Sequence, residues 1–142
     1  MKISASLYLS VLFFFPLVHS TPAQDAGTSF FKNEIELAEY IVMPEILVDK
    51  IMAGHTDFVL YDIRSKGEYD AKHVTGAVNL PWEDMAFQNE KDSFSRDKDI
   101  FIISGDGTVS FDAVRFLIGN GFSWMYCIEG GMDNWLYKDL LL

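Results

Sequence analysis

The stretch DIFIISGDGTVSFDAVRFLIGNGF, residues 99–122, decides the fold class. Its first part, residues 99–104, is mostly apolar, which predicts a strand that is buried on both faces. A turn rich in glycine follows, and apolar residues then recur at helical spacing until a glycine pair that suits a helix end. We expect this helix to take Ser110 as its N-cap. The residues that we expect it to bury are Phe111, Val114, Leu117 and Ile118.

The rest of the chain repeats this alternation of strands and helices. Strands are predicted within residues 39–43, 57–63, 76–81 and 123–131. Helical segments are predicted within residues 44–54, 67–73, 82–87 and 132–142, with a charged surface connection over 88–99. This order predicts an α/β fold with a mostly parallel sheet, whose sites lie at the carboxyl ends of the strands.

The first residues of the chain have the pattern of a signal peptide. Lys2 precedes an apolar stretch, residues 7–18, that is too short to span a bilayer and is followed by small residues. We predict cleavage after Ser20, with cleavage after Ala23 as the second choice and an uncleaved anchor as the alternative. The predicted parts are a signal peptide over 1–20, a lead-in segment over 21–38 and one domain over 39–142. Export would make the protein periplasmic in a bacterium and secreted otherwise.

Composition excludes several classes of function. The net charge of −10 without a basic stripe argues against nucleic acid and, once the signal is removed, against a membrane surface. Cys127 is the single cysteine, so an internal disulfide and a cysteine-cluster metal site are excluded. The histidines show no zinc-like spacing. We therefore predict no metal and no cofactor, and as partner either a small anion or a protein of unknown identity.

The turn ISGDGTVS, residues 103–110, is the candidate site. Gly105 and Gly107 permit backbone angles that turn N–H groups inward, and the start of the next helix adds free N–H groups. Such a nest suits an anion, although the carboxylate of Asp106 opposes one. The candidate loop runs through Ser104, Gly105, Asp106, Gly107, Thr108, Val109 and Ser110. The alternative is a tight turn that needs glycine for its geometry alone.

Two residues are candidate nucleophiles. Ser104 stands at the end of a strand, but a serine needs an adjacent general base, and the nearest histidine in sequence is His73. Cys127 lies within an apolar strand, where burial raises the pKa of a thiol. Asp62 and Arg64 stand at the end of another strand and form either an ion pair that fixes the loop or, through Arg64, a contact to an anion.

Three stretches together resemble the rhodanese superfamily. YDIRSKGEYDAKHVTGAVNLP, residues 61–81, is similar to the family pattern D-x-R…E-[YF]…H-x-x-G-A-x-N-[IL]-P. The strand, loop and helix that end in GNGF, residues 119–122, are the second stretch. IEGGMDNW, residues 128–135, resembles the closing motif L-E-G-G-x-x-x-W. The resemblance covers about residues 39–140, and it implies a five-stranded parallel sheet flanked by helices.

The resemblance also implies an activity and shows where this chain departs from it. Members of the family transfer sulfur through a cysteine persulfide in a loop that resembles C-R-x-G-x-R-S. In that alignment Ser104 stands where the cysteine belongs, and Gly105 and Val109 stand where arginines often lie. The resemblance therefore implies a domain without sulfurtransferase activity that acts as a binding or accessory module. The alternative is residual enzyme activity through Cys127 or Ser104.

Overall fold

The computed structural model describes residues 37–142 of the chain. The predicted signal peptide and all but the last two residues of the lead-in segment lie outside the described residues. Within them, no helix is both long and apolar enough to cross a lipid bilayer.

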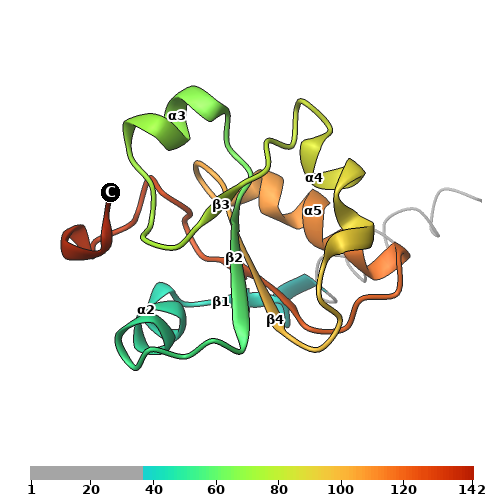
Figure 1. Ribbon diagram of the computed structural model, residues 1–142, viewed down its shortest axis with the longest axis horizontal. Coiled ribbons are helices and arrows are strands. Elements are labelled where there is room, and N and C mark those ends of the chain that lie inside the picture. The colour runs from blue at the N-terminus through green and yellow to red at the C-terminus, as the bar shows by residue number, and fades with distance from the viewer. Residues whose placement is uncertain (1–36) are drawn as a thin grey trace, which may run out of the picture.

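A five-stranded parallel sheet forms the centre of the described domain (Figure 1). Its strands are β1 (Ile41–Val42), β2 (Phe58–Asp62), β3 (Val78–Asn79), β4 (Asp99–Ile103) and β5 (Met125–Ile128). Their order across the sheet is β1-β5-β4-β2-β3, so β4 lies at the centre between β5 and β2. The sheet confirms the α/β fold that the alternating elements predict.

Helices cover both faces of the sheet. They are α2 (Pro44–Met52), α3 (Lys66–Ala71), α4 (Ala86–Asn89) and α5 (Thr108–Gly119), with 3₁₀ turns η1 (Lys91–Ser93) and η2 (Lys138–Leu140). Figure 1 shows α2 and the C-terminal segment on one side of the strands, and α4 and α5 on the other. Each side has its own apolar core, centred on Leu47 and Phe101 beneath α2 and on Phe87 and Leu117 beneath α4 and α5.

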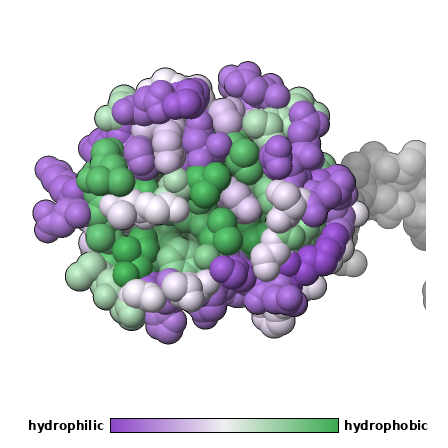
Figure 2. All heavy atoms as spheres, viewed as in Figure 1, coloured by the Kyte–Doolittle hydropathy of each residue, from purple (hydrophilic) through white to green (hydrophobic). Residues whose placement is uncertain are grey.

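Apolar side chains also reach the surface at one edge of the sheet. Figure 2 shows them gathered across the middle of the visible face, over β2 and β3 and beside α2. Val78 of the edge strand β3 is 46% exposed. The rim over α3 is mostly hydrophilic in the same view.

The helix after β4 differs from the prediction at both its start and its buried face. It begins at Thr108 with Gly107 as the N-cap, so the prediction of Ser110 as N-cap is wrong. Ser110 lies inside the first turn and is fully buried, and its hydroxyl bonds to the Ser104 hydroxyl and not to the helix backbone. Ile118 is 41% exposed, and Ala113 takes its place on the buried face.

The closing helix predicted over residues 132–142 is also wrong. Only the short turn η2 is helical there, and the last residues are extended. Leu142 and His73 exchange backbone hydrogen bonds of 2.9 and 3.0 Å, and Leu141 forms an antiparallel bridge with Val74. This pairing with a distant segment satisfies backbone groups that a helix would have satisfied locally.

The connection over residues 88–99 is not wholly a charged surface segment. Phe94 within it is 5% exposed and stacks on Tyr61 of β2, with 4.5 Å between the ring centroids. A single buried aromatic ring among charged residues holds this connection on the core.

Candidate functional site

The candidate site lies at the carboxyl-terminal edge of the sheet, where sites of parallel α/β folds form. An open pocket of about 400 Å³ is lined by the loop after β4, the turn after β2, Trp82 and Glu83 after β3, and Asp133 after β5. Parallel strands bring these four connections to one edge. The whole candidate loop except Gly107 and Ser110 contributes to this lining.

Backbone contacts with the closing motif hold the loop after β4. The carbonyl oxygen of Ser104 accepts from Met132 N at 2.9 Å, and that of Gly105 accepts from Asp133 N at 2.9 Å. Gly131 approaches so closely that a Cβ there would lie under 3.0 Å from both carbonyl oxygens. Gly131 has φ +55°, so both the close approach and the backbone angle require glycine.

The orientation of these carbonyls fixes the direction of the neighbouring amides. In a planar trans peptide the N–H points opposite to the carbonyl of the preceding residue. The N–H groups of Gly105 and Asp106 therefore point away from the closing motif. Among the described residues the Gly105 N–H has no hydrogen-bond acceptor, whereas the Asp106 N–H interacts with the carboxylate of its own side chain.

Ser104 is buried at the end of β4 and lines the pocket. It is 3% exposed, and its Oγ accepts a hydrogen bond from the Ser110 hydroxyl at 2.9 Å. His73 is held elsewhere, because its Nδ1 lies 2.8 Å from the Tyr69 carbonyl oxygen and its ring stacks on the Tyr69 ring. The structure therefore does not bring Ser104 and His73 together as nucleophile and base.

Asp106 caps the start of α5 with its own side chain. Its Oδ1 accepts from the Thr108 N–H at 2.9 Å and from the Thr108 hydroxyl at 2.6 Å. These two hydrogen bonds lower the pKa of the Asp106 carboxyl. A negative charge that belongs to the chain therefore occupies one donor at the helix start, which disfavours a bound anion there.

Asp62 and Arg64 form an ion pair beside the pocket. Asp62 is fully buried, and its carboxylate accepts from Arg64 Nε at 3.0 Å and from a terminal guanidinium nitrogen at 2.5 Å. The same guanidinium nitrogen donates to the Lys72 carbonyl oxygen at 2.8 Å. Asn79 closes the turn by donating to the carbonyl oxygens of Asp62 and Arg64 at 3.0 and 2.9 Å. Arg64 lines the pocket, but its charge is already compensated.

Cys127 lies behind the loop, in a different hollow. This second pocket of about 230 Å³ is lined by Cys127, Gly107 and Phe111 among others. The residue is 1% exposed, and burial raises the pKa of its thiol to about 12. The thiol is therefore uncharged at neutral pH and separate from Ser104.

Sequence reasoning missed the carboxylates that share the pocket with the loop. Glu83 and Asp133 line the pocket with Trp82, although they are far from residue 104 along the chain. The available signal was their position directly after predicted strands, since such positions meet at one sheet edge. Among the described residues, no group of three or more histidine, cysteine or acidic residues is placed to hold a metal ion.

Comparison with known proteins identifies the family. The model of the rhodanese-like domain matches residues 43–138. Because this match spans more than half of the chain, the chain belongs to the rhodanese-like domain family. The resemblance predicted from the three motifs is thereby confirmed at the level of the domain.

The relatives include thiosulfate sulfurtransferases. The chain is 35% identical over 81 residues to thiosulfate sulfurtransferase GlpE of Pseudomonas entomophila, covering 54% of this chain and 69% of that protein. It is 25% identical over 103 residues to the uncharacterized protein YqhL of Bacillus subtilis, covering 70% and 80%. A probable molybdopterin-synthase adenylyltransferase of Porphyra purpurea is 35% identical over 109 residues, covering 77% of this chain but only 26% of that longer protein.

Solved structures agree in fold. A rhodanese-like domain protein from Staphylococcus aureus has a TM-score of 0.61 at 22% identity, covering 70% of this chain and 93% of that chain. The rhodanese-like domain of the Alr3790 protein from Anabaena has a TM-score of 0.60 at 24% identity, covering 68% and 72%. These likenesses confirm the five-stranded parallel sheet flanked by helices.

Proposed function

We propose that this chain is an exported rhodanese-like domain protein without sulfurtransferase activity, which acts as a binding or accessory module. The observation that carries the proposal is Ser104, a buried serine where the family's loop after the fourth strand is expected to hold its cysteine. Persulfide transfer needs a thiolate that accepts and releases sulfane sulfur. A serine hydroxyl has no equivalent of the persulfide state.

The surroundings of Ser104 also argue against its use as a nucleophile in place of the cysteine. Its hydroxyl is bonded to Ser110, and among the described residues no histidine is hydrogen-bonded to it, so it lacks the imidazole base of a serine–histidine pair. Val109 and Gly105 supply no cation where the family often has arginine. Arg64 is the only cationic residue that lines the pocket among the described residues, and it is bound to Asp62. An anionic sulfur donor would therefore meet no free positive partner.

Cys127 does not replace the missing thiol. Sulfur transfer needs an accessible thiolate, whereas this thiol is buried and its pKa is raised to about 12. Cys127 is therefore assigned to the core of the sheet in this proposal.

The test is a thiosulfate:cyanide sulfurtransferase assay on the chain without residues 1–20, with GlpE as the positive control. We expect no thiocyanate above a boiled sample. The variant Ser104→Cys restores a thiol without the arginines, so its rate should stay far below that of GlpE. Turnover by the wild-type protein that disappears in Cys127→Ser or Ser104→Ala would contradict the proposal and identify the active residue.

Export is tested separately. The full chain is expressed with a C-terminal tag, and the mass of the recovered protein is measured. We expect an N-terminus at Thr21, consistent with cleavage after Ser20. A mass that includes residue 1 would contradict the proposed signal peptide.

A further inference from the structure

We infer that the pocket in front of Ser104 binds a basic amino acid, either free or as a residue of a peptide, through its cationic side chain. The inference rests on the proposed binding role of this pocket and names its ligand class. It is carried by three features of the lining: net negative charge, an aromatic wall and a buried pair of hydroxyls that leaves one proton without an acceptor.

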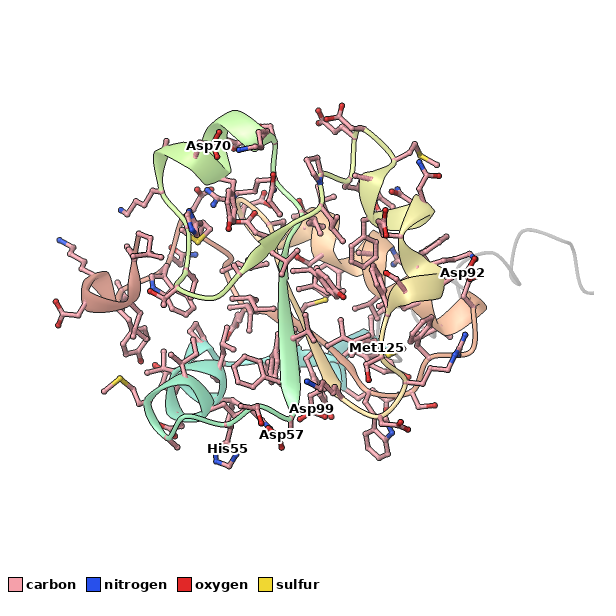
Figure 3. The ribbon with its side chains drawn as sticks, viewed as in Figure 1. His55, Asp57, Asp70, Asp92, Asp99 and Met125 are labelled. Carbon is pink, nitrogen blue, oxygen red and sulfur yellow. The ribbon has the colours of Figure 1, made fainter. Side chains whose placement is uncertain are left out.

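The lining carries net negative charge. Four carboxylates line the pocket, those of Glu68, Glu83, Asp106 and Asp133. None of them forms an ion pair with a described residue. The amino-terminal edge of the sheet differs, because there Lys50 pairs with Asp57 at 3.3 Å and with Asp99 at 3.0 Å. Figure 3 shows these two aspartates beside His55, away from α3.

Two of the carboxylates accept only uncharged donors. Glu68 accepts from the Ser65 hydroxyl at 2.5 Å and from Ser65 N at 3.1 Å, and Asp106 accepts from Thr108. These bonds lower the pKa of both carboxyls, and the nearby Arg64 charge lowers that of Glu68 further, so both stay ionised at neutral pH. The field inside the pocket therefore attracts a cation and repels an anion.

Trp82 supplies an aromatic wall on the same pocket. It is partly exposed and lies against Phe87 and Phe116, with ring centroids 5.9 and 6.1 Å apart. A tryptophan face attracts an ammonium or guanidinium group through its quadrupole. Carboxylates together with an indole favour an organic cation over a hydrated metal ion, and an organic cation is what a basic side chain offers.

The hydrogen bonding of Ser104 points to a ligand independently of the charge and of Trp82. Its side chain lines the pocket at 3% residue exposure and shares one hydrogen bond of 2.9 Å with the Ser110 hydroxyl. Whichever of the two hydroxyls donates, one proton of this buried pair has no acceptor among the described residues. A buried donor without an acceptor is costly unless a ligand provides one. The unpaired N–H group of Gly105 belongs to the same loop. A backbone carbonyl or carboxylate oxygen of an amino acid supplies the acceptor that a simple amine lacks.

The first test compares arginine with citrulline, its uncharged analogue of nearly the same shape, by calorimetric titration at low ionic strength. We expect arginine to bind about tenfold more tightly than citrulline, and added salt to remove most of the difference. N-acetylarginine amide is titrated in parallel to distinguish a peptide residue from the free amino acid. Whichever of the two cations binds more tightly identifies the source of the ligand.

Matched variants assign the binding to the pocket. Glu83→Gln should weaken arginine binding several-fold, whereas Asp84→Asn removes the same charge from an exposed neighbour outside the lining and should leave binding unchanged. Ser104→Ala should weaken arginine and citrulline by the same factor, because it removes a bond to the shared acceptor. Glu83 and Asp84 are both exposed, so loss of folding does not confuse the comparison of their variants.

The outcomes separate this inference from the proposed function. Equal affinity for arginine and citrulline, no binding of either, or an equal effect of Glu83→Gln and Asp84→Asn would overturn the inference. Tighter binding of thiosulfate than of arginine would overturn it as well, because the pocket would then be an anion site. The sulfurtransferase assay does not depend on these binding results, so the proposed absence of catalysis is tested separately.

Discussion

Two connections at the same edge of the sheet are fixed in opposite ways. The turn after β2 is fixed by side chains, since Asp62, Arg64 and Asn79 bond to one another and to its backbone. The loop after β4 is fixed by backbone bonds to the closing motif and by the missing side chain of Gly131. The first turn is therefore sensitive to charge, and the second is sensitive to volume.

The largest effect is expected where the loop after β4 meets the closing motif. Gly131→Ala places a Cβ against the carbonyl oxygens of Ser104 and Gly105. We expect it to lower the free energy of unfolding by about 3 kcal/mol or more. The control is Gly54→Ala, which has a similar positive φ of +70° but open space around it, and should cost only about 1 kcal/mol. Urea unfolding measures the free energy of unfolding of both variants. Equal losses would show that the close approach of Gly131 to the two carbonyl oxygens adds nothing to the cost of its substitution.

The turn after β2 is tested by removing its buried charge. Asp62→Ala leaves the Arg64 side chain, which is 10% exposed, without its carboxylate. We expect a loss of about 3 kcal/mol, because an unpaired charge remains buried. Asp70→Ala breaks the exposed pair with Lys66 and should cost about 0.3 kcal/mol in the same urea experiment. A comparable loss of unfolding free energy in both variants would contradict the claim that the buried ion pair stabilises the turn after β2.

The hollow behind the loop after β4 is tested through pH. The pKa of Cys127 is raised from 9.0 to about 12 in the folded chain, so the folded state holds the thiol proton more tightly than the unfolded state. This contribution to stability is complete below pH 9 and falls as the pH rises toward 12. Between pH 7 and pH 10 it should fall by about 1.4 kcal/mol. The same measurement on Cys127→Ala gives the contribution of all other titrating groups, which is then subtracted. If the free energy of unfolding depended on pH in the same way in both proteins, the thiol would be exposed.

The smallest effect is expected at the cap that follows the turn after β2. Ser65 and Glu68 form a capping box at the start of α3. Ser65→Ala should lower the free energy of unfolding by about 1 kcal/mol. Ser123→Ala, at an exposed serine, serves as the control and should change it by less than about 0.5 kcal/mol. If Ser123→Ala lowered the free energy of unfolding more than Ser65→Ala does, the capping box would not be a specific source of stability.

The strands and most helices could be predicted because their signals are local. The apolar runs around Leu60 and Ile102, and Pro44 at a helix start, determine their own segments whatever surrounds them. The closing helix failed because residues 141–142 pair with a segment near residue 74. Local pattern carries no information about a backbone partner almost seventy positions away.

The sequence by itself determined the α/β class, the family and the residue types of the loop after β4, including a serine with glycines around it. Only the tertiary structure decided what that loop faces. It brings Glu83, Trp82 and Asp133 in front of Ser104 and leaves Cys127 behind it. The physical reason is that parallel strands return the chain to one edge of the sheet, so neighbours in the pocket are distant in sequence. The residues of the loop can be read along the chain, whereas the charge of the pocket depends on which other connections meet the loop at the carboxyl ends of the strands.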